Sequence, residues 1–483
     1  MRRSRGALLP PVPDQRVRGR SLYRTLRDAL LAGALAPGER LPSSRQAAAD
    51  YRVSRGMVEQ VYGQLGEEGF LERGIGRGTF VAAPAARPGV AGMAPAAERR
   101  LAPGRRGRRL AASAACREPE RPRAFDAGVA DTREFPWRTW LRLQSRACRT
   151  LAGEAMNLAD PRGVPALRTA IARHLAGARG IRCQPGQVVV FSSSQQALLA
   201  ATLLLLERGD GVWLEDPCYP GARAALELAG AAIAPIPVDA HGLRVEVGLR
   251  VAPRARLAYV TPSHQYPTGA MLSLERRRAL LAWANRRGAW IVEDDYDGEF
   301  RYAGQPLTPL VALDPDARVI YLGTFSKATF VSLRLAYLVL PEPLVEPLAN
   351  LRTQLDGFTP AIPQLTMSAF MDDGHFAPHL RRMRAIYGEK HAQLVAGLRP
   401  LAQRGWSWSP NPAGLHLLVR HPSAELVRRV VATSGLALAR LSAYRLRPAR
   451  DDGLLLRYGG LDLEDVCAGA AQLAHAVARA TDP

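Results

Sequence analysis

Alternation of two kinds of segment constrains the fold of this chain more than any other feature. From Phe125 onwards, short runs rich in β-branched residues alternate with longer segments of helical periodicity. Such alternation predicts βαβ units, in which helices cover a mostly parallel sheet, so we expect an α/β fold there. The candidate central strands are residues 187–191, 211–215, 255–261, 290–293 and 318–321.

Composition divides the chain into three parts. Residues 15–83 combine helical periodicity with a glycine-rich hairpin pattern, and residues 125–483 form the α/β part. Residues 84–124 are rich in Ala, Pro, Gly and Arg and almost free of large apolar residues, which predicts a flexible basic linker. At 483 residues and 47% hydrophobic content, the chain is too long for one core. The expected fold class is therefore multidomain.

The balance of charge indicates an anionic partner. The formal net charge is +21, and nucleic acid is the simplest partner for such an excess. Five cysteines are scattered without a C-x-x-C pair, so we expect a reducing, cytoplasmic environment. The longest apolar run, residues 197–206, is too short to cross a bilayer, and no hydrophobic run follows the N-terminal arginines. We therefore expect no membrane association and no secretory signal.

Residues 15–83 have the pattern of three short helices and a hairpin. Apolar positions recur with helical spacing in residues 21–30, and further short helices are predicted to start near residues 42–45 and 53–56. Residues 70–81 flank a glycine-rich basic tip, as in a β-hairpin. Together these elements predict an α+β winged helix-turn-helix that binds double-stranded DNA. The candidate DNA-binding residues are Arg45, Ser54, Arg55, Gly76 and Arg77.

Each of these residues has an expected contact. Ser54 and Arg55 begin the third helix and would face base edges in the major groove. Arg45 would contact the DNA backbone or a guanine, and Arg77 at the wing tip would contact the minor groove or phosphates. The alternative is a small helical domain with ordinary solvated arginines. The segments at residues 33–45 and 74–81 resemble the GntR family of bacterial transcription regulators, which implies an operator as the partner.

Lys327 stands out because lysine is rare in this chain. Of the 65 basic residues, only Lys327 and Lys390 are lysines. Arginine is always charged and cannot act as an amine nucleophile, whereas lysine can deprotonate and form a Schiff base. Lys327 also lies in a hydroxyl-rich segment, residues 323–334, that ends in an arginine. We therefore expect Lys327 to be a catalytic, imine-forming residue rather than a chance surface lysine.

The surrounding motifs supply what pyridoxal 5'-phosphate requires. Its site needs an imine-forming lysine, an acid for the ring nitrogen, a partner for the ring hydroxyl, a phosphate cradle and a group that stacks on the ring. One carboxylate of residues 293–295 can serve the nitrogen, Arg334 suits a bidentate phosphate contact, and Tyr219 can stack on the ring. The polar turn 192–196 opens a helix whose amides can hold phosphate. Each motif alone is more often ordinary structure, but all occur in the order expected of strand ends in one α/β domain.

These phrases resemble the fold-type I aminotransferases over nearly all of residues 125–483. With its GntR-like head, the chain resembles the MocR subfamily of regulators; residues 261–269, 293–302 and 379–384 also carry the resemblance. It implies pyridoxal 5'-phosphate as cofactor and a homodimer as the assembly. It also implies that Lys327 holds the cofactor, that Asp294 pairs with the ring nitrogen and that Tyr296 contacts the ring hydroxyl. The residues that it assigns to the phosphate are Ser194, Gln195, Thr324, Ser326 and Arg334.

Several positions depart from the aminotransferase pattern. Tyr266 stands where the family often has an asparagine that binds the ring hydroxyl, and His264 or Gln265 is the candidate to take over that contact. Leu158 stands where a tyrosine commonly reaches the neighbouring subunit's phosphate, and a leucine cannot make that bond. Residues 331–332 replace a usual Pro-Gly, which can reshape the phosphate loop.

A further departure concerns the substrate carboxylate. Many aminotransferases place an arginine at the position of Leu455, whereas here Arg457 follows two residues later, on the same face of a strand. Arg457 is the candidate contact for an effector carboxylate, with a solvent-exposed or structural role as the alternative. His375 and His379 have a spacing that suits a metal, but Pro378 lies between them and no third ligand is evident. We therefore expect no metal site.

Three functions fit these expectations. The first is a transcription regulator whose aminotransferase-like domain senses an amine, amino acid or B6 vitamer through Lys327 and shifts the DNA-binding heads between two arrangements. The second is an active aminotransferase with a vestigial DNA-binding head. The third is a cofactor-free dimerisation scaffold, which Leu158 and Tyr266 favour. The complete wing and the missing carboxylate arginine favour the regulator, without physiological turnover.

Overall fold

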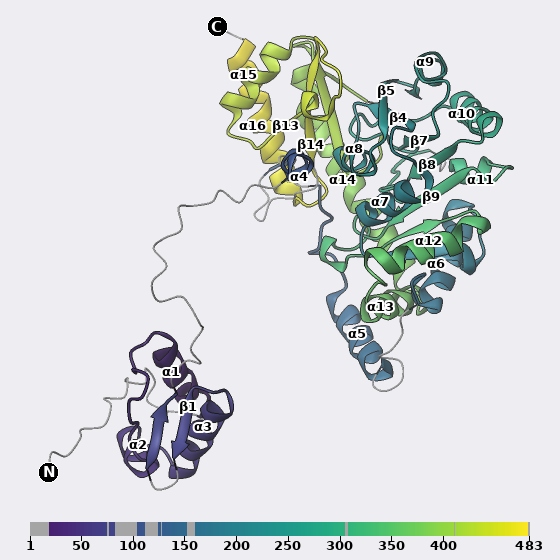
Figure 1. Ribbon diagram of the computed structural model, residues 1–483. Coiled ribbons are helices and arrows are strands. Elements are labelled where there is room, and N and C mark those ends of the chain that lie inside the picture. Colours follow the sequence, from purple (N-terminus) through teal and green to yellow (C-terminus); the bar gives the residue numbers. More distant parts are fainter. Residues whose placement is uncertain are drawn as a thin grey trace. The chain divides into compact units, whose positions relative to one another are not determined.

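The protein is described here by a computed structural model, which covers residues 19–74, 77–82, 104–111, 124–126, 128–151, 160–304, 308–409 and 411–481. Its internal contacts divide the chain into two compact units, residues 1–104 and 105–483 (Figure 1). The division falls inside the predicted linker, residues 84–124. Most of that segment lies outside the described residues, but Arg105–Ala111 forms a short helix, α4, which composition did not predict. The limits of the linker stay a prediction.

The smaller unit contains three helices and a two-stranded antiparallel hairpin. The elements are α1 (Gly19–Leu31), α2 (Ser44–Asp50), α3 (Arg55–Glu67), β1 (Leu71–Gly74) and β2 (Gly78–Val81). The apolar faces of the helices meet in one core, in which Leu22, Val58 and Leu65 are fully buried. Ser43 and Ser54 cap α2 and α3, because each hydroxyl accepts an amide hydrogen of the first turn. The predicted winged helix-turn-helix is confirmed.

The larger unit is built on an eight-stranded sheet in the order β3-β10-β9-β8-β7-β4-β5-β6. The strands are β3 (Val188–Phe191), β4 (Gly211–Asp216), β5 (Ala232–Asp239), β6 (Gly242–Leu243), β7 (Leu257–Val260), β8 (Trp290–Asp294), β9 (Val319–Thr324) and β10 (Ala336–Val339). Within this order, the neighbouring strands β9, β8, β7, β4 and β5 run parallel to one another. β10 pairs antiparallel with β3 and β9, and β6 pairs antiparallel with β5. All five predicted strands exist. β5 was missed because its two prolines obscure the apolar pattern.

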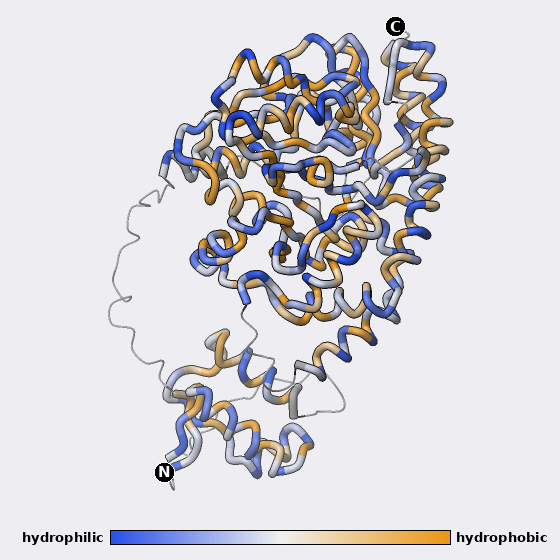
Figure 2. The backbone as a smooth tube through the Cα atoms, turned by 90° about the vertical axis from the view of Figure 1, so that its right-hand side faces the viewer, coloured by the Kyte–Doolittle hydropathy of each residue, from blue (hydrophilic) through white to orange (hydrophobic). Residues whose placement is uncertain are grey.

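Helices cover both faces of this sheet. They are α5 (Trp137–Leu151), α6 (Pro165–Arg179), α7 (Ser194–Leu205), α8 (Pro220–Ala229), α9 (Val245–Val251), α10 (Leu274–Arg287), α11 (Leu310–Leu313), α12 (Glu342–Leu355) and α13 (Ala361–Asp372). Along β7, Leu257 and Tyr259 pack with α7, α8 and α12, whereas Ala258 and Val260 pack with α9 and α10. Side chains alternate between the two faces of a strand, so one short apolar run serves two cores. Along the helices, hydrophobic and hydrophilic residues alternate every few positions (Figure 2).

A second, smaller sheet has the order β11-β12-β14-β13. Its elements are β11 (Ser407–Trp408), β12 (His416–His421), β13 (Ala439–Arg440) and β14 (Asp452–Arg457), with helices α14 (Phe376–Ala402), α15 (Ala424–Ser434) and α16 (Leu463–Thr481). Buried leucines and valines of the three helices pack on this sheet. The unit therefore combines a large sheet with helices on both faces and a smaller sheet packed against three helices, as expected of a fold-type I aminotransferase. Within the described ranges, no helix combines the length and the apolar character needed to cross a bilayer.

Candidate functional site

Two residues predicted to hold the cofactor lie where neighbouring parallel strands end. Asp294 is the last residue of β8, and Lys327 follows Thr324, the last residue of β9. The carboxyl ends of parallel strands share one edge of a sheet, which is where ligands of such folds collect. Lys327 is half-buried, and its Nζ donates a hydrogen bond to the carbonyl oxygen of Gly128. The fold thus brings the amine and the acid to one edge of the sheet.

The structure gives three consecutive acids different roles. Glu293 accepts two backbone amide hydrogens at the start of α11. Asp295 forms a buried ion pair with Arg179. Asp294 remains, and its Oδ2 accepts a hydrogen bond of 2.6 Å from the hydroxyl of Tyr259. Sequence reasoning left the choice among these carboxylates open until the family resemblance was considered, and the hydrogen bonds support Asp294.

The environment of Asp294 fits a partner for a protonated ring nitrogen. Asp294 is 5% exposed, and burial raises the pKa of its carboxyl to about 7, while the positive charge of Lys327 acts in the opposite direction. A buried carboxylate of this kind lacks a full countercharge. A protonated pyridine nitrogen beside it would supply that charge, so the residue suits pyridoxal phosphate.

We expect Asp294→Asn to weaken the dependence of stability on pH. Because the folded protein holds a proton on Asp294 that the unfolded chain releases, this residue's contribution is complete below its ordinary pKa and is lost as the pH rises through about 7. The variant should remove about 2 kcal/mol of the stability lost between about pH 5 and pH 8. Denaturant unfolding of protein prepared without cofactor measures this. The exposed Asp465→Asn is the control, and equal slopes for Asp294→Asn and the parent would contradict the assignment.

Tyr296 is held in place by His264. The tyrosine hydroxyl donates to the backbone carbonyl oxygen of His264 at 2.9 Å and lies 3.1 Å from the Nδ1 atom of the same residue. That Nδ1 atom also lies 2.8 Å from Oδ2 of Asp297, and both side chains are buried. His264 therefore positions Tyr296. The predicted contact of His264 with the ring hydroxyl stays a prediction.

A group of possible metal ligands overlaps this arrangement. One ligand atom from each of His264, Asp297 and His416 lies within 4.8 Å of the others. The hydrogen bond between His264 and Asp297 already uses two of these groups. In the pair considered from sequence, Nε2 of His379 is hydrogen-bonded to the carbonyl oxygen of Ala328 at 2.8 Å. The absence of a metal site stays an expectation.

Aromatic rings surround Tyr266. Its ring meets those of Tyr219, Tyr296 and Tyr444 edge-on, with centroid separations of 5.8, 5.9 and 5.6 Å. Such edge-to-face contacts are favourable and hold rings in fixed orientations. Tyr219, which directly precedes α8, is therefore in one cluster with Tyr296. The cluster supports the predicted stacking role of Tyr219, and it gives Tyr266 a packing role that the sequence did not indicate.

The predicted phosphate cradle is the N-terminus of α7. Ser194 is the first residue of this helix, and the preceding serine caps it. Helix N-termini present free amides and a positive dipole end to anions. The side chain of Gln195 donates to the carbonyl oxygen of Gly221 at 2.9 Å, and a Cβ atom at Gly221 would lie 2.4 Å from atoms of Gln195 and Tyr219. Glycine at this position therefore lets the side chains of Gln195 and Tyr219 pack closely against the start of α8.

The segment after β9 supplies the remaining phosphate candidates. The hydroxyl of Thr324 accepts the amide hydrogen of Ser326 at 3.2 Å. Residues 331–333 form a short 3-10 helix, and the exposed Arg334 follows it with a left-handed φ of 55°. Within the described ranges, the guanidinium of Arg334 forms no hydrogen bond or ion pair, so it can receive an anion. Leu158 lies outside the described residues, and its predicted effect stays untested.

Arg457 and Lys327 both donate hydrogen bonds to the short segment of residues 126–128. The guanidinium of Arg457, at the end of β14, donates to the carbonyl oxygen of Asp126, and Lys327 bonds to Gly128 two residues further on. Burial, and also the positive charges of Arg457 and Lys327, hold the pKa of His416 well below its ordinary value. The two cations therefore lie near the same buried histidine. Two neighbouring cations attract anions, so a carboxylate is the ligand group that suits this pair.

Leu455 explains why no arginine occupies the usual position. Its side chain is fully buried and packs with Leu418, Leu441 and Tyr444, with Tyr266 beside them. An arginine there would place an unpaired charge in an apolar cluster. Arg457 also donates to the hydroxyl of Tyr444, so the cluster and the charged site share one residue.

Sequence reasoning missed Glu215. This residue near the end of β4 is 2% exposed and accepts hydrogen bonds from Thr261 at 2.7 Å and from Gln265 at 3.1 Å. Burial raises the pKa of its carboxyl to about 7. The bonds tie β4 to the turn that carries Tyr266. An acid at the end of an apolar strand was the available signal.

The predicted DNA-binding residues occupy two places on the smaller unit. Arg45 and Arg55 are exposed in the first turns of α2 and α3, and Nε of Arg55 lies 3.3 Å from the hydroxyl of Ser44. The hydroxyl of Ser54 caps α3, so this residue positions the helix whatever it contacts in DNA. Arg77 is exposed in the turn between β1 and β2. Gly76 lies outside the described residues, and these contacts stay predictions.

A winged helix-turn-helix joined to an α/β unit with a lysine and an acid at its strand ends defines a class: a DNA-binding head fused to an aminotransferase-type domain. Residues 18–81 match the gntR family of bacterial regulatory proteins, and residues 130–452 match aminotransferase class I and II. The chain belongs to the GntR-type regulators with an aminotransferase domain, the MocR subfamily.

Individual relatives agree with this assignment. The chain is 36% identical over 462 residues to the probable rhizopine catabolism regulatory protein MocR of Rhizobium meliloti, covering 95% of this chain and 93% of the relative. It is 31% identical to the pyridoxine biosynthesis regulator PdxR of Corynebacterium glutamicum, covering 94% and 95%. The structure of the α-aminoadipate aminotransferase LysN of Thermus thermophilus, complexed with N-(5'-phosphopyridoxyl)-L-leucine, matches with a TM-score of 0.67 and 28% identity, covering 74% and 92%. Fold and neighbours support pyridoxal phosphate as the cofactor.

Proposed function

We propose that this protein regulates transcription by binding an operator with residues 15–83 and sensing an amine with residues 125–483, the two parts being joined by residues 84–124. The observation that carries the proposal is the position of Lys327 and Asp294 at adjacent strand ends, in a chain that also holds a complete winged helix-turn-helix. The regulatory relatives support the first half of the proposal, and the chemistry of the strand ends supports the second.

Each site residue has a defined task in this proposal. Lys327 would hold the cofactor through Nζ, Asp294 would hold its ring nitrogen and Tyr296 its ring hydroxyl. The phosphate would lie at the N-terminus of α7 near Arg334, with Ser194, Gln195, Thr324 and Ser326 beside it. When bound, pyridoxal phosphate supplies a carbonyl group that captures primary amines. An effector amine and Lys327 Nζ would therefore compete for the same place.

The effector would carry a carboxylate as well as an amine. Arg457 is the support for this, because it donates a hydrogen bond to the same segment as Lys327, and a guanidinium can bind a carboxylate through two charge-assisted hydrogen bonds. A ligand bound between the two cations favours one arrangement of the unit. It can shift DNA binding by its difference in affinity for the two arrangements.

Replacing Arg457 tests the effector class. We expect Arg457→Met to weaken the binding of amino acids by about 10- to 100-fold, because a charge-assisted hydrogen bond to a carboxylate contributes about 1.5–3 kcal/mol. The matched amines that lack the carboxylate should bind as before. Titration of the visible spectrum with each amino acid and its decarboxylated counterpart measures both. Tyr444→Phe removes a neighbour of Arg457 without removing the charge, and equal weakening for amines and amino acids would show a structural role.

Turnover as an aminotransferase is the second candidate function. The similarity to LysN favours it, whereas the apolar cluster around Leu455 opposes it. Incubation with an amino acid and an oxo-acid acceptor distinguishes the two: a sensor changes its spectrum once, without releasing product over many cycles. We further propose that the protein acts as a homodimer, as expected for this fold. Analytical ultracentrifugation of the full chain tests this, and a monomer at micromolar concentration would contradict it.

A further inference from the structure

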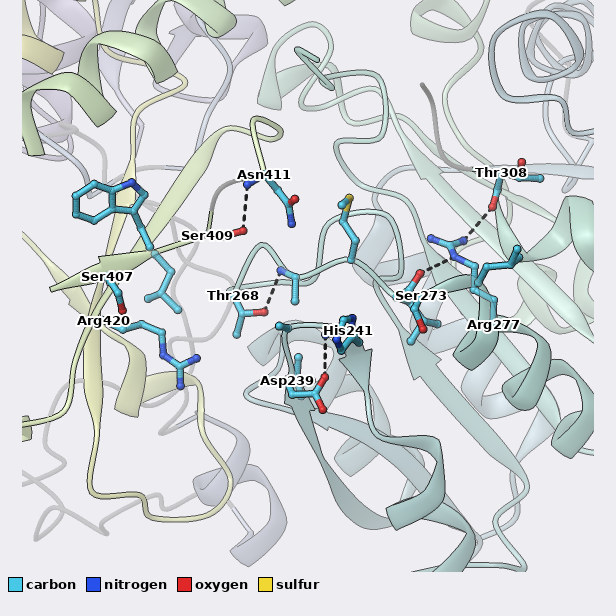
Figure 3. A pocket seen from close by; sticks show the side chains of 18 of the residues that line it. Asp239, His241, Thr268, Ser273, Arg277, Thr308, Ser407, Ser409, Asn411 and Arg420 are labelled. Atoms are coloured by element: carbon cyan, nitrogen blue, oxygen red, sulfur yellow. Dashed lines mark hydrogen bonds between the residues drawn. The ribbon is translucent and has the colours of Figure 1, made fainter. Parts of the chain in front are cut away.

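A large cavity opens between the two sheets of the larger unit. Its volume is about 860 Å³, which lies within the range of about 300–1,000 Å³ usual for small-molecule sites. One wall comes from β11 and β12 with the loop between them, and the other from β5, the turn after Tyr266 and the start of α10. Figure 3 shows Ser407 and Arg420 on one side of this space, and Asp239, Ser273 and Arg277 on the other.

The cavity is separate from the cofactor site. None of the residues assigned above to pyridoxal phosphate or to the effector carboxylate lines it. The turn of residues 264–270 lies between the two places: His264 and Tyr266 contact Tyr296, whereas Thr268 and Ala270 line the cavity. The turn is therefore a shared wall.

The lining combines an apolar body with an excess of positive charge. Trp408, Met271, Leu274 and Leu418 supply apolar surface. Arg278 is exposed on α10 and, in the part of the chain that the structure describes, its guanidinium has no hydrogen-bonded or ionic partner. A flat indole and an uncompensated guanidinium suit an aromatic ligand that carries a negative charge.

The nearby acids do not cancel this charge. Asp239, which also lines the cavity, accepts two hydrogen bonds from Arg276, at 2.6 and 2.8 Å. Two other cations line the cavity. Arg420 is paired at 2.7 Å with Asp451, which does not line the cavity, and the buried Arg277 donates to the backbone carbonyl oxygens of Leu272, Thr308 and Pro262. Arg278 is thus the cation that remains to receive an anionic ligand.

Contacts within the shared wall connect the cavity to residues of the cofactor site. The hydroxyl of Thr268 donates to Gln265 at 2.6 Å, and Gln265 in turn donates to Glu215 at 3.1 Å, near the end of β4. On the other side of the cavity, Leu418 packs in the same apolar cluster as Tyr266. A ligand that moved either wall would therefore displace residues in contact with Tyr266.

We propose that this cavity is a second ligand site, which takes a small aromatic anion and bridges the two sheets of the larger unit. The claim is independent of the proposed function, because it concerns binding at residues that the cofactor does not use. Its consequence for the regulator is that a compound other than the amine effector can alter the environment of Tyr266.

Two fluorescent probes test the charge and the apolar body separately. Anilinonaphthalene sulfonate carries a sulfonate on its rings, and N-phenylnaphthylamine has the same rings without the charge. We expect the full chain to bind the sulfonate at one site, with energy transfer from Trp408 that is lost in Trp408→Phe. Arg278→Glu should weaken the affinity for the sulfonate at least tenfold and change the affinity for the neutral probe by no more than about twofold, because only the charged contact is reversed.

Matched variants decide whether binding occurs in the cavity. Arg286→Glu makes the same change of charge on the same helix outside the cavity and should leave both probes unaffected. Ser409→Trp should fill the space and abolish binding of both, while Lys327→Ala should preserve it. Equal weakening by Arg278→Glu and Arg286→Glu, or loss of binding in Lys327→Ala, would overturn the proposal. Arg278 is on the surface and packs into no core, so its variant tests the idea even where Ser409→Trp fails to fold.

Discussion

Replacing Lys327 by alanine is expected to abolish the visible absorption band of the purified protein. The band requires a covalent link between pyridoxal phosphate and an amine, and Lys327 is the lysine at the end of β9, beside Asp294. The effect should be complete, because no other amine side chain reaches this edge: the second lysine, Lys390, is 3% exposed and is paired with Asp131 at 2.7 Å. The spectrum before and after borohydride reduction measures the change.

Two arginine variants separate amine chemistry from charge. Lys327→Arg keeps a positive charge beside Asp294 but cannot form the covalent link, so it should also be colourless. Lys390→Arg removes the other lysine and should keep the band. A parent protein that stays colourless with added pyridoxal phosphate would overturn the sensor and favour the cofactor-free scaffold. A band that survives in Lys327→Ala would show that an amine other than Lys327 forms the covalent link.

The second large effect is expected from Arg55→Ala in the smaller unit. We expect at least about a fivefold loss of affinity for the operator, because an arginine contact to a base contributes about 1–3 kcal/mol. The arginine is the first residue of α3, its side chain is 62% exposed, and its ion pair with Glu59 is long, at 3.9 Å. Its charge is therefore available to DNA. Fluorescence anisotropy with operator and random duplexes, at fixed salt, measures the loss.

A control on α1 distinguishes specific contact from general attraction. Arg27→Ala removes the same charge from an arginine that is paired with Asp28 at 3.0 Å, and it should weaken binding to both duplexes little. Arg55→Ala should weaken the operator more than the random duplex, because base contacts specify whereas charge alone does not. Equal losses for the two variants on both duplexes would show that Arg55 contributes only to the electrostatic field.

Local pattern was sufficient for the framework of the fold. The five predicted strands appear as β3, β4, β7, β8 and β9, and the hairpin appears as the wing. Apolar residues that recur at every second position indicate a strand, and those that recur every three to four positions indicate a helix, so these patterns report local secondary structure directly. β5 was not predicted because two prolines break its apolar pattern, and β10 was also missed, although it is as long as the predicted strands β3 and β7. Helix α4 lies in a segment whose composition predicted a linker.

The site was predictable only in part. Motifs located Lys327 and the acidic segment, and the hydrogen bonds then assigned each acid to a different partner. Glu215 was missed because its partners, Thr261 and Gln265, lie about fifty residues away. The same holds for Leu455, whose neighbours in the apolar cluster decide that an arginine does not belong there. Such choices depend on what packs against a residue, which a local window does not contain.

The sequence by itself indicated the two-part architecture and five strands of the larger sheet, and it singled out Lys327 as the expected reactive amine, because periodicity and side-chain chemistry are properties of short segments. Only the tertiary structure decided that Asp294 is the carboxylate near Lys327, that Arg457 reaches the same segment as that lysine, and that a cavity opens beside Arg278. These facts join residues far apart in the chain. They follow from how strand ends and loops pack together, because burial and pairing set the charge and the contacts of each side chain.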